Sequence, residues 1–102
     1  MQLNGKEVEL RITGKTLLVY KESFKKNLMN VMRTIVNGTY DALDIYEIVY
    51  AILKSNGEMS GTSFDRFVEQ TNPSSVIGEK AFSEILNAVN GMFDQDQELK
   101  KN

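Results

Sequence analysis

Apolar residues recur at helical spacing through residues 40–53, and this is the strongest pattern in the chain. Asp41, Asp44 and Glu47 form one polar stripe, because successive helical residues are turned by about 100°. The apolar side chains spread over about half of the circumference: Ala42, Leu43, Ile45, Tyr46, Val49, Tyr50, Ile52 and Leu53. The pattern predicts an amphipathic helix whose apolar arc is wide enough for both a core and a partner. A short helix rich in phenylalanine is expected behind it, over residues 62–70.

Residues 2–12 have the turn pair and the alternation of apolar and charged residues that are typical of a β-hairpin. Asn4 and Gly5 are a favoured turn pair, because both residues tolerate positive φ. After the turn, apolar and charged residues alternate: Val8, Leu10 and Ile12 against Glu7, Glu9 and Arg11. The first strand is short, so we expect helices to pack on the apolar face of the hairpin.

Two helices are expected between this hairpin and residue 40. Residues 15–23 could form a third strand or a helix, and spacing that continues to Phe24 favours the helix. Residues 24–36 have a clearer helical pattern, which Gly38 ends in the usual way. Thr39 is then expected to cap the helix that follows.

The last helix is predicted over residues 75–93, after a break at Pro73. Residues 94–102 are polar and are expected to form a disordered tail. The chain therefore predicts a single α+β domain over residues 1–93, with a short N-terminal hairpin followed by four or five helices.

Composition excludes several classes of chemistry. The chain has 102 residues, no cysteine and no histidine, so Ser-His and Cys-His mechanisms and ordinary zinc sites are excluded. No apolar run approaches the about 18 residues that a membrane span needs, and the start has no signal-peptide core. The absence of cysteine fits a reducing cytoplasm.

Charge is divided unevenly along the chain. Residues 1–36 have a net charge of +4 and residues 37–102 a net charge of −6. The acidic excess argues against nucleic acid as the main partner. One alternative stays open, a small phage or plasmid DNA-binding regulator that uses a basic helix from Lys21 to Arg33, including Lys26.

Patterns that could carry catalysis or ligand binding are weak. Gly14, Lys15 and Thr16 copy the end of a phosphate-binding loop, but Glu9 stands where that loop needs glycine. The acidic stripe lacks the glycine-turn loop of calcium sites and is interpreted as a solvated face. No catalytic residue, metal ligand or cofactor site is assigned, and an enzyme is not expected.

Four residues are candidates for partner contact. Tyr46 and Tyr50 lie at one edge of the wide apolar arc, and tyrosine suits interfaces as well as core edges. Met92 and Phe93 end the last amphipathic helix, and methionine adapts to varied partners. Packing in the core is the alternative interpretation for all four residues.

The order of these segments resembles the tail assembly chaperones of long-tailed bacteriophages, especially those of Gram-positive hosts. The matching pieces are LNGKEVELRITGKTLLVY, DALDIYEIVYAILK and SFDRFVEQ, followed by the C-terminal amphipathic helix. The resemblance covers most of the chain, and it rests on a pattern of apolar helices rather than on fixed catalytic residues.

The resemblance implies a binding function without a cofactor. Members of the family are thought to coat the tape measure protein in the host cytoplasm and to leave before the virion is finished. It implies the tape measure protein as partner, the major tail tube protein as a further candidate, and weak self-association. Family genes often contain a ribosomal frameshift near their end, which Lys100-Lys101 would mark here.

Overall fold

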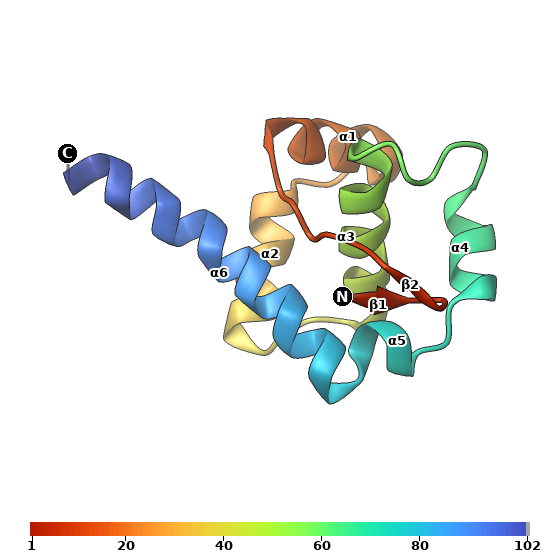
Figure 1. The fold of residues 1–102 in the computed structure, drawn as a ribbon. Coiled ribbons are helices and arrows are strands. Elements are labelled where there is room, and N and C mark those ends of the chain that lie inside the picture. Colours follow the sequence, from red (N-terminus) through yellow and green to blue (C-terminus); the bar gives the residue numbers. More distant parts are fainter. Residues whose placement is uncertain (102) are drawn as a thin grey trace.

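The computed structural model describes the backbone of residues 1–101 and the side chains of residues 1–92. Over residues 1–101, a two-stranded hairpin precedes six helices, which confirms the predicted α+β fold with one helix more than expected. The helices are α1 (Gly14–Phe24), α2 (Leu28–Asn37), α3 (Ala42–Ser55), α4 (Phe64–Gln70), α5 (Ser74–Ile77) and α6 (Glu79–Lys101). Figure 1 shows α3 at the centre, with α1 across one of its ends, α5 near the other, and α4 to one side.

The hairpin forms as the sequence predicts, but its second strand is shorter. Strand β1 (Gln2–Leu3) pairs antiparallel with β2 (Lys6–Glu7). The turn has φ of 52° at Asn4 and 80° at Gly5, as a type I′ turn requires. The ladder ends where Val8 N donates to Met1 O at 2.8 Å. Residues 9–12 then run over the core outside the hairpin ladder.

The segment from Lys21 to Arg33 is two helices rather than the single basic helix considered above. Helix α1 ends at Phe24, and its C-cap Lys25 adopts the left-handed conformation with φ of 58°. Helix α2 begins after Asn27, whose side chain accepts a hydrogen bond from Met29 N. Lys26 lies in the break and pairs with Glu47. The prediction of one continuous DNA-contacting helix is therefore wrong, because the capped break at residues 25–27 divides the segment.

The N-cap of α3 is Asp41, two residues after Thr39, the predicted N-cap. Asp41 is the N-cap, since its carboxylate accepts from Leu43 N at 2.8 Å and its N–H donates to Asp44 at 3.0 Å. The Asp41 and Asp44 carboxylates thus each accept from a backbone N–H at the start of the helix, and both suit the positive end of the helix dipole. Two members of the predicted acidic stripe thus start the helix.

The predicted last helix is divided at Gly78. Pro73 leads into the one-turn helix α5, and Gly78 N closes it by donating to Ser74 O at 3.2 Å. A Cβ at Gly78 would lie 2.3 Å from Ser74 O, so only glycine fits this sharp bend. Helix α6 then continues to Lys101, beyond the end predicted at residue 93. The backbone of the tail predicted over residues 94–102 is thus helical as far as Lys101. Its disorder stays a prediction, and the side chains from residue 93 onward lie outside the described part.

The core is built around α3, which is buried on nearly every side. Ile45, Ile48, Val49, Ile52 and Leu53 are fully buried. Helices α1, α4 and α5 all contact α3. The wide apolar arc in the sequence is therefore filled by several neighbours within one chain.

Candidate functional site

Tyr46 and Tyr50, the first candidates for partner contact, lie in the core. They are 6% and 4% exposed, and each hydroxyl donates to a backbone carbonyl of the same chain. Tyr46 reaches Thr71 O at 3.0 Å, and Tyr50 reaches Thr62 O at 2.6 Å. Neither side chain offers a surface to a partner in this fold. Their assignment to a contact edge is therefore corrected to core packing, because α4 and the loop before it cover that side of α3.

An aromatic cluster explains why both tyrosines are held inside. The Tyr50 ring lies 5.5 Å from that of Phe64 and 5.7 Å from that of Phe67, between centroids. Phe24 from α1 completes the group, with its ring 4.9 Å from Phe64. Edge-to-face and tilted contacts of this kind stabilise aromatic pairs. The cluster joins α1, α3 and α4.

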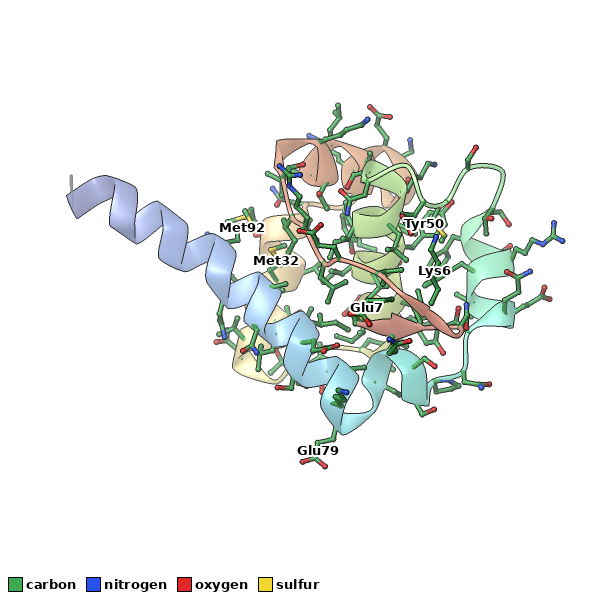
Figure 2. All side chains as sticks on the ribbon, viewed as in Figure 1. Lys6, Glu7, Met32, Tyr50, Glu79 and Met92 are labelled. Carbon is green, nitrogen blue, oxygen red and sulfur yellow. The ribbon has the colours of Figure 1, made fainter. Side chains whose placement is uncertain are left out.

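Met92 and Phe93 have different outcomes. Met92 is half-buried and packs against the core cluster, at the place where α6 leaves the globular body (Figure 2). The side chain of Phe93 lies outside the described residues, so its proposed contact stays a prediction. Of the four candidates, only Met92 is shown to be partly accessible.

Glu47 is the centre of a polar network on α3. Its carboxylate accepts from the Tyr20 hydroxyl at 2.8 Å and from Lys26 Nζ at 2.9 Å. Lys26 also lies 3.7 Å from Asp44. Glu47 is 13% exposed. Of the stripe predicted to be solvated, Asp41 is exposed, whereas Asp44 and Glu47 tie the α1–α2 turn to α3 and Glu47 also ties α1 to it.

The raised pKa values of Tyr20, Tyr46 and Lys26 predict that the fold weakens at alkaline pH. Burial and the hydrogen bond to Glu47 raise the pKa of Tyr20, burial raises that of Tyr46, and the hydrogen bond to Glu47 raises that of Lys26. Stability from a raised pKa is complete below the unfolded value, about 10 for tyrosine, and is lost as the pH rises through the folded value. Urea unfolding at stepwise higher pH should therefore show falling midpoints above about pH 10. Ionisation of Tyr20 and Tyr46 at their ordinary pKa in the still folded protein would contradict this.

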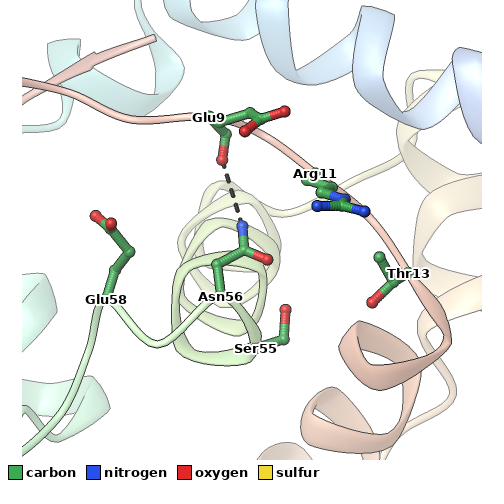
Figure 3. Close-up of a pocket in the computed structure, with 6 residues that line it drawn as sticks. All are labelled: Glu9, Arg11, Thr13, Ser55, Asn56 and Glu58. Atoms are coloured by element: carbon green, nitrogen blue, oxygen red, sulfur yellow. Dashed lines mark hydrogen bonds between the residues drawn. The ribbon is translucent and has the colours of Figure 1, made fainter.

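A polar cavity of about 420 Å³ lies between the extended residues 9–13 and the end of α3. Its lining, drawn in Figure 3, consists of Glu9, Arg11, Thr13, Ser55, Asn56 and Glu58. The hydroxyl of the lining residue Ser55 lies 3.0 Å from that of Thr16, between Oγ and Oγ1. Because Ser55 donates to Ile52 O and Thr16 accepts from Thr13 N, the free proton of Thr16 bonds Ser55. These hydroxyls tie the start of α1 to the end of α3 and form no nucleophile-base pair.

Four exposed apolar side chains lie at the opposite end of the molecule from α1. They are Val36, Tyr40, Leu43 and Ile77, with exposed fractions of 49%, 36%, 54% and 40%. They come from the end of α2, the α2–α3 turn, the start of α3 and the end of α5, four segments that lie away from α1 in the view of Figure 1. Phe82 of α6 stacks on Tyr40 with centroids 5.2 Å apart. We call these four residues the apolar end.

The sequence pattern missed the apolar end. Its residues lie beside helix caps, at Gly38, Asp41 and Gly78, rather than within a long amphipathic stripe. An apolar residue next to a cap cannot be assigned to a face by periodicity alone. One feature of the sequence could have indicated an exposed apolar residue there: Leu43 lies at the margin of the wide apolar arc of residues 40–53.

The described residues contain neither a metal-binding cluster nor a membrane-spanning helix. Among them, no group of three or more histidine, cysteine, aspartate or glutamate side chains could hold a metal ion. In the same part of the chain, no helix is both long and apolar enough to cross a bilayer.

Comparisons with models of known protein families, with curated proteins and with solved structures gave no match for this chain.

Proposed function

We propose that this chain is a phage tail assembly chaperone that holds amphipathic helices of a tape measure protein at its apolar end. The resemblance in segment order supports the family, and the observation that carries the binding mode is the exposure of Val36, Tyr40, Leu43 and Ile77. Grouped exposed apolar side chains are typical of protein-binding surfaces.

The position of the apolar end suits a helical partner. The start of α6 lies beside it, since Tyr40 stacks on Phe82 and α5 leads directly into α6. An amphipathic helix would place its apolar stripe across these residues, as in helix-in-groove recognition. Contact through four side chains gives each copy of the chain modest affinity for the tape measure protein. Many copies bound along one tape measure protein would together form a stable complex. Modest affinity also permits release.

Two substitutions test the binding surface directly. Leu43→Glu and Ile77→Lys are each expected to weaken binding of a tape measure segment by at least about tenfold, because a charge then replaces an apolar contact. Both side chains are exposed, and the negative charge of Leu43→Glu suits the start of α3, so the fold should be kept. Isothermal titration with a tape measure segment encoded beside this gene measures the change.

Leu18→Glu is the matched control. Leu18 is 58% exposed on α1, at the other end of the molecule. The affinity of this variant should equal that of the original chain. If all three substitutions weaken binding of the tape measure segment equally, or if none of them weakens it, the apolar end is not the binding surface.

The wider role has its own tests. As a chaperone, the protein would act in the host cytoplasm, would be absent from the finished virion, and would have the major tail tube protein as a second partner. Genes for a tail tube protein and a very long tape measure protein should flank this gene. Neighbouring genes of another kind would remove the tail-assembly role and leave the helix-binding surface to be explained.

A further inference from the structure

Four of the seven glycines of this chain directly follow an asparagine. The pairs are Asn4-Gly5, Asn37-Gly38, Asn56-Gly57 and Asn90-Gly91. In such a pair the backbone nitrogen of the glycine can attack the side-chain amide before it, because glycine has no side chain to hinder the approach. All four asparagines are exposed, and a Cβ at any of the four glycines would meet no atom within 4 Å. Exposure and crowding therefore do not distinguish the four pairs.

Hydrogen bonding of the glycine N–H group does distinguish them, because an N–H held by an acceptor must be released before its nitrogen can attack. Gly38 N donates to Ile35 O at 3.1 Å. Gly57 N donates to Lys54 O, also at 3.1 Å. Gly91 lies inside α6, where a helical N–H donates to the carbonyl four residues earlier. These three pairs react only after a helix end or a helical turn has opened.

The tip of the hairpin leaves the fourth N–H free. Asn4 and Gly5 are the central residues of the type I′ turn, and among the described residues Gly5 N donates to no acceptor. The hairpin ladder instead pairs Leu3 with Lys6, on either side of the turn. Asn4 Nδ2 donates to Thr71 Oγ1 at 3.3 Å, which is long for a hydrogen bond. Attack within this pair therefore breaks no backbone hydrogen bond.

We propose that Asn4 is a self-modification site, at which the folded chain converts this asparagine to aspartate and isoaspartate. Gly5 N gives up its proton to the solvent and forms a bond to Asn4 Cγ. The bond from Cγ to Nδ2 breaks, and the amide nitrogen takes up a proton and leaves as ammonia. Water then opens the cyclic imide at either carbonyl carbon and returns a proton to Gly5 N. Water is consumed and ammonia released in equal amounts, without oxidation or reduction.

The isoaspartate product disturbs the hairpin more than the aspartate product does. In isoaspartate the backbone runs through Cβ, so a methylene is added to a turn whose length sets the register of the strands. The hairpin carries Leu3 and leads into Val8, which are both buried in the core. Aspartate keeps the turn, because its short side chain tolerates the left-handed conformation. Both products add one negative charge to the net charge of −2. None of this depends on the tail-assembly role.

Peptide mapping of the aged protein tests the assignment. Trypsin cleaves after lysine and arginine, so each asparagine-glycine pair falls in a peptide of its own: residues 1–6, 34–54, 55–66 and 81–100. After incubation of the folded chain at mildly alkaline pH, peptide 1–6 should convert at least about fivefold faster than the other three, which wait for local opening. Tandem mass spectrometry locates the change at Asn4 and identifies isoaspartate.

The same chain unfolded in urea is the matched control. Unfolding releases all four N–H groups, so the four peptides should convert at similar rates and peptide 1–6 should lose its lead. Similar rates in the folded chain, or faster conversion at another pair, would overturn the proposal. So would an Asn4 that stays unchanged in the folded chain while the unfolded chain reacts. The isoaspartate fraction, separated by anion exchange, should unfold at a lower urea concentration than the unmodified chain.

Discussion

Replacement of Tyr50 by alanine is expected to lower the free energy of unfolding by about 3–5 kcal/mol, the range found for deletion of a large buried aromatic side chain. Tyr50 is 4% exposed, and its ring contacts Phe24, Phe64 and Phe67. The substitution would leave a cavity where α1, α3 and α4 meet. Because small domains have total stabilities of about 5–15 kcal/mol, part of the population should be unfolded. Urea unfolding followed by circular dichroism measures the loss.

Two further variants separate packing from hydrogen bonding at Tyr50. Tyr50→Phe keeps the ring and removes only the bond to Thr62 O, so it should cost about 1 kcal/mol. Tyr40→Ala, at an exposed tyrosine, is the matched control and should cost no more than about 1 kcal/mol. A Tyr50→Ala protein as stable as the Tyr40→Ala protein would show that Tyr50 is not a core residue.

Replacement of Glu47 by alanine is expected to cost about 2–3 kcal/mol, because hydrogen bonds to charged groups contribute more than neutral ones. Tyr20 is fully buried and its hydroxyl would lose its acceptor. Lys26 would lose its ion pair, which contributes little because Lys26 is 46% exposed. Thermal or urea unfolding measures the loss.

A double-mutant cycle identifies the source of that loss. Glu47→Gln keeps an acceptor for Tyr20 and removes the charge, so it should cost less than Glu47→Ala. In a Tyr20→Phe background no hydroxyl is left without an acceptor, so Glu47→Ala should cost clearly less than in the original chain. Equal costs in both backgrounds would show that the Tyr20–Glu47 bond does not stabilise the fold.

Most of the fold could be predicted from short-range patterns. Asn4-Gly5 specified the hairpin turn, and the periodicity of residues 24–36 and 40–53 specified helices. The division of the last helix at Gly78 was missed, because its cause is a close approach to Ser74 O that no periodicity reveals. The end of β2 at Glu7 was also missed, since the alternation in the sequence continues through residues that have no partner strand.

The contact surface was harder to predict than the fold. Tyr46 and Tyr50 looked available because the arc of α3 exceeded what one neighbour could cover. The number of neighbours is a tertiary property, and α1, α4 and α5 together cover the arc. Leu43 belongs to the same arc and is 54% exposed, because it lies in the first turn, beyond those neighbours. Periodicity in the sequence assigns a residue to one face of a helix. The position of Leu43 along the axis of α3, however, decides that it is exposed while Tyr46 and Tyr50 are buried.

Nuclear magnetic resonance titration of the isotope-labelled chain with an amphipathic tape measure helix tests helix binding at the apolar end without any substitution. Amide shift changes that saturate with the helix are expected at Val36, Tyr40, Leu43 and Ile77. Amides around Leu18 and around the buried Tyr50 should change little. An absence of shift changes, or changes confined to α1, would contradict helix binding at the apolar end.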